Sequence, residues 1–252
     1  MAKRTRNLFS PGAKTPYKLS RSRLENFIRC PRCFYLDRRL GVDQPPGFPF
    51  NLNSAVDHLF KKEFDHYRQL QEPHPLMKAN GVDAVPFEHS DLEKWRDPFS
   101  GIQFHHKQTN ITVFGGIDDL WRHRDGSLIV VDYKATSKDG EITLEDEWKD
   151  GYKRQLEIYQ WLFQQNGFKV SNTGYFVYTN GLRSESAFND CLKFKTVLLP
   201  YEGNSDWVEE ALIQAHACLT KEQLPPISQQ CEFCQYIAAV KQVEGTFHAS
   251  FL

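Results

Sequence analysis

The sequence predicts an α/β fold in which a mixed β-sheet is flanked by helices. Its expected elements follow the order helix, helix, hairpin, helix, two strands, helix, which favours helices on both faces of one sheet. The apolar run "LIVV" at residues 128–131 is typical of a buried strand. With 40% hydrophobic and 25% charged residues, the 252-residue chain has the composition of an ordinary globular protein.

The N-terminal part of the chain predicts two helical segments and a longer helix. We expect residues 1–19, rich in Lys, Arg, Pro and Gly, to be a flexible basic lead-in. Ser20 or Ser22 can cap a helix, and Pro31 suits the start of a second segment. The stretch "NSAVDHLFKKEFDHYRQL" has helical spacing of its apolar side chains, Val56, Leu59, Phe60 and Phe64. Residues 71–110 show no clean period.

The rest of the chain predicts both strands and helices. Two β-rich runs flank "RDG" in a hairpin between residues 110 and 135, and a helix over 148–167 ends at a glycine. Two further strands are predicted over 173–181 and 191–200, the first of them with alternating aromatic residues. Two helices follow, over 204–220 and 231–243, with a Pro-Pro break between them.

Charge and cysteine content limit the location and partners of the chain. The net charge is −1, but residues 1–40 carry eleven Lys and Arg against two acids. This basic segment is either a phosphate-binding face or a solvated arm. No apolar run approaches the length of a membrane span, and no apolar region follows the basic start. We therefore expect a cytoplasmic protein without a membrane partner, whose six cysteines are thiols or metal ligands.

The hairpin register decides which carboxylate faces Asp132. A two-residue loop places Asp119 opposite Asp132, and a three-residue loop places Asp118 there. The three-residue loop puts Gly126 at the left-handed position of a type I turn with a bulge, which favours it. In either register two carboxylates and Lys134 converge on one face of the sheet. Mg²⁺ or Mn²⁺ can neutralise such a pair, and Lys134 then lies near the water or a phosphate. A solvated surface hairpin is the alternative.

Two C-x-x-C pairs lie near the two ends of the chain, Cys30 with Cys33 and Cys231 with Cys234. Together they predict a four-thiolate metal site, which Zn²⁺ and iron–sulfur clusters both use. Such a site would join the N-terminal and C-terminal helices. By analogy with disulfide closure, it would remove about 5 kcal/mol of unfolded-state entropy. Cys191 and Cys218 belong to no motif and are expected to be buried apolar fillers.

The segments "GGIDDLW", "IVVDYKATS" and "QLEIYQ" together resemble the PD-(D/E)XK nuclease superfamily, more narrowly its RecB-type domains and the iron–sulfur exonucleases of CRISPR adaptation. These proteins carry G-x-I-D, (D/E)-x-K and Q-x-x-x-Y. Asp118 matches the first motif, which favours it over Asp119 as the partner of Asp132. Asp132 and Lys134 match the second motif, and Gln155 and Tyr159 match the third.

The resemblance implies a restriction-endonuclease-like fold and roles for the matched residues. Asp118 and Asp132 would hold Mg²⁺ or Mn²⁺ with the Tyr133 backbone carbonyl. Lys134 would assist the water, and Gln155 and Tyr159 would orient the lysine, the water or a phosphate. His58 fits the place of a metal-binding histidine in the family, although the glycine that precedes it there is absent.

The resemblance also favours an iron–sulfur cluster, in particular a 4Fe-4S cluster, at the four cysteines. The related proteins divide their cysteines one and three around the nuclease core, whereas this chain divides them two and two, which keeps zinc open. We expect a single nuclease domain over 20–245, with its core at about 50–200 and a cysteine subdomain from 20–40 and 225–245.

The functional hypothesis is a metal-dependent deoxyribonuclease, an exonuclease acting on DNA ends or single strands, in DNA repair, recombination or CRISPR-type DNA processing. Its partner would be DNA, with a helicase or a CRISPR adaptation protein as further candidates. One alternative is a non-catalytic nucleic-acid-binding protein on the same fold. Another is a small redox or metal-carrier protein in which the C-x-x-C pairs are the function.

Overall fold

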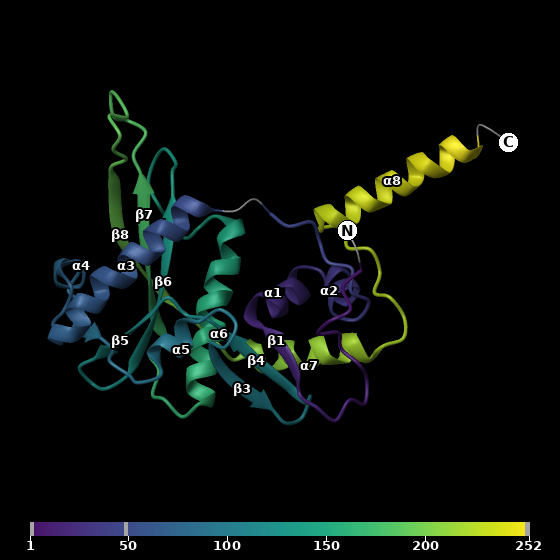
Figure 1. Cartoon of the computed structure of the whole chain (residues 1–252), viewed down its shortest axis with the longest axis horizontal. Helices are drawn as coiled ribbons and strands as arrows, with labels where there is room; N and C mark the ends of the chain where they lie inside the picture. The colour runs from purple at the N-terminus through teal and green to yellow at the C-terminus, as the bar shows by residue number, and fades with distance from the viewer. Residues whose placement is uncertain (1–2, 48–49, 250–252) are drawn as a thin grey trace. The chain divides into compact units, whose positions relative to one another are not determined.

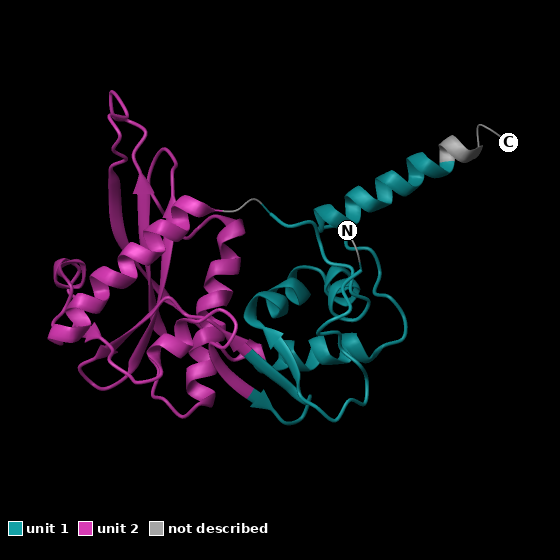
Figure 2. Cartoon of the chain, in the orientation of Figure 1, with its two compact units in different colours: residues 1–47, 105–113, 209–252 teal, residues 48–104, 114–208 magenta. Residues whose placement is uncertain are grey.

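The computed structural model describes residues 3–47 and 50–249, and it divides into two compact units (Figure 2). Unit 1 comprises residues 1–47, 105–113 and 209–252, and unit 2 comprises residues 48–104 and 114–208. The strands β3 (Ile102–His106) and β4 (Ile111–Gly115) run from one unit into the other. They form a three-stranded sheet with β1 (Tyr17–Ser20), in the order β1-β4-β3.

Unit 2 is built on a five-stranded mixed sheet in the order β2-β5-β6-β7-β8. The strands are Ala84–Pro86, Asp119–His123, Leu128–Thr136, Thr173–Gly181 and Phe194–Glu202. Strands β6 and β7 are parallel, and the other pairs are antiparallel. Both long strands predicted after residue 170 are present, the second displaced toward the C-terminus.

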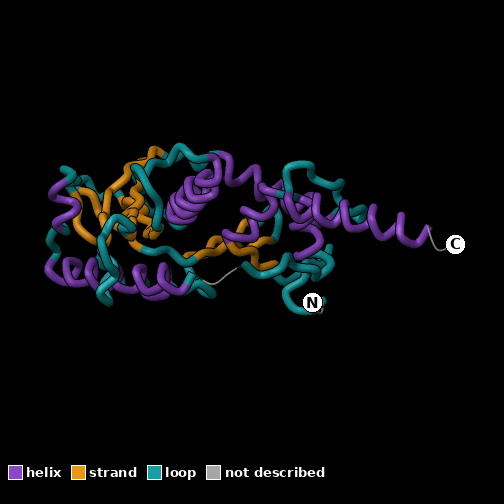
Figure 3. Tube along the Cα trace, turned by 90° about the horizontal axis from the view of Figure 1, so that it is seen from above, coloured by secondary structure: helices purple, strands orange, loops and turns teal. Residues whose placement is uncertain are grey.

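Helices cover both faces of this sheet, as the sequence predicts. Helix α3 (Asn51–Leu70) lies along one face and α6 (Asp150–Gln165) along the other (Figures 1 and 3). Phe64 of α3 packs in a buried cluster with Ile129, Val131 and Tyr133, the three residues of β6 that point to its side. On the opposite face the Leu156 side chain of α6 packs so closely on Gly174 of β7 that a Cβ there would clash.

Shorter elements complete unit 2 in the region for which the sequence shows no clean period. Helix α4 spans Pro75–Ala79 and α5 spans Leu92–Arg96. A 3₁₀ turn, η1 (Glu147–Lys149), precedes α6. Among the described residues, none of the helices combines the length and the apolar composition that a bilayer span requires.

Unit 1 contains the helices that carry the cysteine pairs. Helix α1 (Arg21–Arg29) is followed at once by α2 (Pro31–Arg38), so the two segments predicted around Pro31 are both helical. Most of α7 (Trp207–Thr220) and all of α8 (Glu232–Ala249) also belong to this unit. The expected helices over 204–220 and 231–243 correspond to these two.

Part of the segment 1–19, expected to be a flexible lead-in, is packed within unit 1 in the structure. The Phe9 side chain is buried, and its N–H donates to the Arg38 carbonyl at 2.8 Å. Tyr17–Ser20 is strand β1. The sequence pattern misses this packing because four residues are too few to show a strand period, and the segment's polar composition hides its one anchoring aromatic residue.

Three of the basic residues in the segment 1–40 form ion pairs inside unit 1. Asp37 is buried, with 2% of its surface exposed. Arg4, Arg23 and Arg38 all place guanidinium nitrogens within 2.9 Å of its carboxylate. A buried carboxylate needs such neutralisation, so these three arginines are not free charges for a phosphate backbone.

Candidate active site

The β5–β6 hairpin has the register that places Asp118 opposite Asp132. Asp119 pairs with Val131 and Arg122 with Leu128, so continuing the ladder by one residue brings Asp118 across from Asp132. The His123 N–H donates to the Ser127 carbonyl at 2.9 Å, which closes the three-residue loop. Gly126 has φ +83°, the left-handed value that the loop requires. The predicted loop type is confirmed.

Asp118 is held by the backbone of the neighbouring strand. Strand β5 begins only at Asp119, so the Tyr133 N–H of β6 has no strand partner on that side and donates to Asp118 Oδ2 at 2.9 Å. The N–H and C=O of one residue in a strand point to the same side. The Tyr133 carbonyl therefore points to the side on which Asp118 lies.

Asp132 and Lys134 form an ion pair on the α6 face of β6. Asp132 is 1% exposed, whereas 15% of the Lys134 side chain remains accessible. Burial alone would lower the pKa of Lys134, but attraction to Asp132 and Asp118 outweighs it, and the pKa is raised. The Lys134 ammonium also lies 4.7 Å from the ring centre of Tyr152 on α6. The sequence expectation that this pair shares a face is met.

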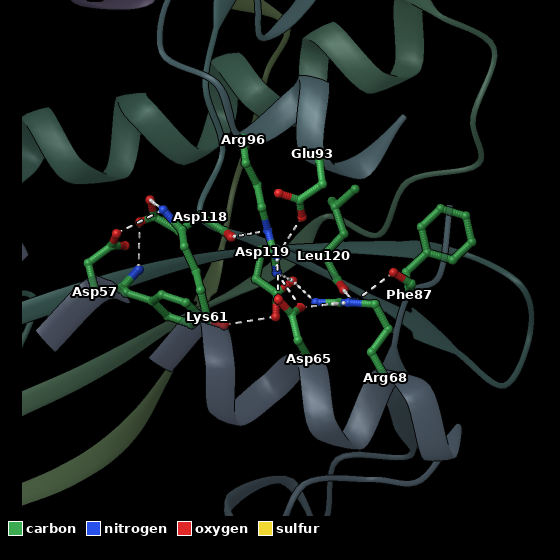
Figure 4. Close-up of polar contacts among 11 residues, drawn as sticks. Asp57, Lys61, Asp65, Arg68, Phe87, Glu93, Arg96, Asp118, Asp119 and Leu120 are labelled. Carbon is green, nitrogen blue, oxygen red and sulfur yellow. Dashed lines mark hydrogen bonds and ion pairs between the residues drawn. The ribbon is translucent and has the colours of Figure 1, made fainter. Parts of the chain in front are cut away.

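Helix α3 adds an acid and a base that sequence reasoning missed. Asp57 and Lys61 are one helical turn apart, and the Lys61 ammonium lies 2.8 Å from Asp57 Oδ2 and 3.7 Å from Asp118 Oδ1 (Figure 4). Burial raises the pKa of Asp57, and the negative charge of Asp118 raises it further. The "DHLFK" spacing of i and i+4 charges was the available signal, but it is common on solvated helices.

His58 lies next to Asp57 on α3, and its side chain is exposed. Within the described residues it makes no hydrogen bond or ion pair. On this helix turn, the neighbouring Asp57 is the residue whose pKa the charge of Asp118 raises. A role for His58 as a metal ligand stays a prediction.

Asp119, the alternative partner in the register argument, has a different environment. It is fully buried and pairs with Arg68 of α3 and Arg96 of α5, the latter at 3.2 Å (Figure 4). The Tyr133 hydroxyl donates to its second oxygen at 2.8 Å. Asp65 bridges the same two arginines. The two adjacent aspartates therefore point into separate networks, and Asp119 is committed to a buried structural one.

The third motif lies on α6. The Tyr159 side chain is buried, and its hydroxyl donates to the Gly116 carbonyl. Gly116 precedes Asp118 by two residues, so this bond fixes the backbone segment that carries the carboxylate. Gln155 lies one turn before Tyr159 and is half-buried. The role that the resemblance implies for Gln155 and Tyr159, orienting the lysine, the water or a phosphate, stays a prediction.

The donor set around Asp118 suits a hard divalent cation. Asp118 and Asp132 supply carboxylate oxygens and Tyr133 a carbonyl oxygen, which are the ligand types that Mg²⁺ prefers and Mn²⁺ accepts. In this structure the ammonium groups of Lys61 and Lys134 neutralise the same two carboxylates. The side chain of Asp118 is 22% exposed, so the site opens to solvent on its side.

The four predicted cysteine ligands come together in unit 1, and all four are buried. Their sulfur atoms all lie within 4.8 Å of one another, and the cysteines form no disulfide. Burial raises the pKa of Cys30 and Cys33. Burial acts in the same direction on Cys231, but the Cys234 N–H and the neighbouring thiols donate to its sulfur and lower its pKa. The predicted clustering of these four cysteines, which joins the N-terminal and C-terminal parts of the chain, is confirmed.

The remaining two cysteines differ from each other. Cys218 is buried on α7, as expected of an apolar filler. Cys191 is exposed, so the same expectation is wrong for it. Cys191 lies in the segment between β7 and β8, where nearly every side chain is exposed and no apolar core is available to receive it.

Comparison with known proteins identifies the family of this chain. Residues 18–239 match the family described as the PD-(D/E)XK nuclease superfamily. Eight chains of solved structures match, among them one described as "Crystal structure of SSO0001", with 16% identity, 85% of this chain and 82% of that chain covered, and a TM-score of 0.34. No curated protein matches. Because the family match spans most of the sequence, the chain belongs to the PD-(D/E)XK nuclease superfamily.

Proposed function

We propose that this protein is a divalent-metal-dependent deoxyribonuclease that acts on DNA ends or single strands. The observation that carries the proposal is the convergence of Asp118, Asp132 and Lys134 at the end of one hairpin. Asp118 and Asp132, with the Tyr133 carbonyl, would hold Mg²⁺ or Mn²⁺. When bound there, the cation supplies Lewis-acid charge that activates water and offsets the charge of the phosphate.

The protein's own groups complete the chemistry. The Lys134 ammonium donates hydrogen bonds to the attacked phosphate and offsets the negative charge that develops on it. The Tyr152 ring and the Asp132 carboxylate hold that ammonium in place. Asp57 and Lys61 form a second acid–base pair beside Asp118 and orient the attacking water. Tyr159 positions Asp118 through the backbone of Gly116.

An exposed aromatic ring beside the site supports the preference for unpaired strands. Trp148 in η1 is 59% exposed, and its ring packs edge-on against Tyr152 at 5.5 Å between centres. Tyr152 in turn faces Lys134. An accessible indole can stack on an unpaired base, which contributes about 1–3 kcal/mol per base. A base adjacent to the cleaved phosphate would be within reach of this ring, whereas a base inside a duplex is already stacked.

The biological setting and the second metal follow from the resemblance alone. The motifs favour a role in DNA repair, recombination or CRISPR-type DNA processing, with a helicase or a CRISPR adaptation protein as partner. They also favour an iron–sulfur cluster at the four cysteines. The nuclease proposal is the same with a cluster or with zinc.

Two substitutions with matched controls test the nuclease proposal. Asp132→Asn and Lys134→Met should each lower Mn²⁺-dependent cleavage of labelled single-stranded DNA by about 10²–10³-fold, the usual cost of removing a group that stabilises the transition state. Asp139→Asn and Lys169→Met change exposed ion-paired residues of unit 2 and should cleave at the wild-type rate.

Folding and binding of each variant are checked by thermal unfolding and by DNA affinity in Ca²⁺. Full cleavage by either site variant would refute the mechanism. DNA binding by the wild type without cleavage under Mg²⁺, Mn²⁺ or Co²⁺ would favour the non-catalytic binding protein instead.

A further inference from the structure

The four sulfur atoms of unit 1 are spaced like the ligands of one metal ion. The Cys30–Cys234 and Cys33–Cys231 sulfurs are 3.6 Å apart, and the Cys33–Cys234 sulfurs are 3.8 Å apart. Four thiolates bound tetrahedrally to one Zn²⁺ at about 2.3 Å must be separated from one another by about 3.8 Å. These three sulfur–sulfur distances are close to the edge of that tetrahedron, and all the sulfurs lie within 4.8 Å of one another.

A four-iron cluster requires a wider arrangement. Each of its four cysteines binds a different iron atom. The four cysteine sulfurs then lie outside the cluster, each on its own iron. The distance between two of these sulfurs exceeds the iron–iron distance, because both iron–sulfur bonds point outward. Every distance between two cysteine sulfurs must therefore be clearly longer than in a tetrahedral site with one metal ion. The contacts at 3.6 Å leave no room for inorganic sulfide between the cysteines.

The backbone around the cysteines repeats one motif twice. Cys30 immediately precedes α2 and Cys33 is its third residue, while Cys231 and Cys234 have the same positions on α8. The Cys33 N–H donates to the Cys30 sulfur at 3.4 Å. Both pairs therefore lie at the positive ends of helix dipoles, which stabilise anionic thiolates. Four thiolates around one divalent ion carry a net charge of −2, and this arrangement offsets it from two sides.

From the spacing, the burial and the paired helix N-termini, we infer that the four cysteines hold a single tetrahedral Zn²⁺ as a closed structural site. This inference does not depend on nuclease activity. It departs from the iron–sulfur cluster that the resemblance favours. The two-and-two division of the cysteines fits it, because each C-x-x-C pair supplies two neighbouring corners of one tetrahedron.

Elemental analysis of the wild-type protein, purified under anaerobic conditions, tests the inference without any variant. We expect one zinc per chain, no acid-labile sulfide, less than a tenth of an iron per chain, and no visible absorbance. Anaerobic handling ensures that an oxygen-sensitive cluster, if present, is retained. Iron with sulfide in the protein, or zinc below half an equivalent, would overturn the inference.

Two variants and a metal replacement locate the ion. Cys33→Ser should lower the zinc content at least fivefold, whereas Cys191→Ser, which changes an exposed cysteine outside the site, should leave it unchanged. Exchange of the native ion for Co²⁺ should give the intense visible and near-ultraviolet bands of tetrahedral cobalt thiolate. If Cys33→Ser does not fold, the cobalt spectrum of the wild type still decides, and an octahedral spectrum would contradict the assignment.

Discussion

The two candidate metal sites of this chain differ in nearly every physical property. The cysteine site in unit 1 has soft sulfur donors from four buried cysteines, and it joins residues as far apart as 204 positions in sequence. The carboxylate site in unit 2 has hard oxygen donors, and two of its acids lie on one hairpin. Its acids are paired with lysines, and Asp118 remains accessible.

This difference matches the roles we propose for the two sites, stability for the cysteines and chemistry for the carboxylates. Structural metal sites are closed, with every ligand position taken by the protein, whereas catalytic sites keep positions open for water and substrate. The cysteines leave no such position, and the carboxylates do. The comparison therefore predicts that changes in unit 1 act on stability and that changes around Asp118 act on turnover.

The largest expected effect is the loss of one ligand of the metal that we propose for unit 1. Cys231→Ser should destabilise unit 1 on the order of 5 kcal/mol, because the link between distant parts of the chain is lost. Hydrogen exchange at the amides of α1 and α2 should accelerate strongly, while exchange in β6 and β7 should change little. Cys191→Ser is the control. If hydrogen exchange accelerated equally in both units, the cysteine site would not act on unit 1 alone, and the contrast between the two sites would be wrong.

The second largest effect is expected from the buried ion pairs that Arg68 and Arg96 form with Asp119. Arg68→Met leaves Asp119 with one arginine in place of two and should lower the free energy of unfolding by about 3 kcal/mol. Arg124→Met removes an exposed arginine of the hairpin loop, with 84% of its side chain accessible, and should cost little. Urea denaturation of both variants measures the effect. Equal stability of the two variants would mean that the network contributes nothing.

Much of this contrast could be predicted from local sequence patterns. What could not be predicted are the contacts between residues that are far apart in the sequence. The turn "RDG" and the alternation around Asp132 define the hairpin register, because register depends on neighbours in the chain. The C-x-x-C spacing likewise predicts the thiolate site. The carboxylate site also needs Asp57 and Lys61, which are about sixty residues before Asp118 on a helix rich in charges. Their pattern is shared by solvated helices, so only the packing of α3 reveals them.

Packing also explains the elements that the sequence pattern omits. Strand β1 and the anchoring of Phe9 depend on pairing with β4 and on the buried Asp37, which no local period records. Strand β2 is three residues long and contains Pro86, a residue that usually argues against a strand. Its position at the edge of the sheet accommodates the proline.

Asp57 sharpens the comparison, because it was identified from structure alone. Asp57→Asn should reduce cleavage by about 10–100-fold, or about 1.4–2.7 kcal/mol of activation free energy, if it orients the water beside Asp118. Its metal content at the cysteines should stay unchanged. Single-turnover kinetics at saturating Mn²⁺ measure the chemical step. The matched control is Asp83→Asn, an exposed acid of unit 2, and an equal rate for the two variants would exclude Asp57 from the site.

The smallest expected effect is the pH-dependent contribution of Asp65 to stability, through its ion pairs with Arg68 and Arg96. Burial alone would raise the pKa of Asp65, but hydrogen bonds from Arg96 and Arg68 outweigh it and lower the pKa. A carboxylate with a depressed folded-state pKa stabilises the fold above its unfolded pKa of about 3.9 and loses that contribution as the pH falls through the folded value. Because 35% of its side chain is exposed, solvent screening limits the contribution to about 1 kcal/mol.

Asp65→Asn should therefore be less stable than the wild type by about 1 kcal/mol at pH 7, and the difference should shrink as the pH falls below about 4. Urea denaturation at several pH values measures it. Asp139→Asn, in an exposed ion pair, should track the wild type throughout. A difference that stays constant with pH would mean that Asp65 acts by packing and not by charge, and the network around Asp119 would then owe its stability to Arg68 and Arg96 alone.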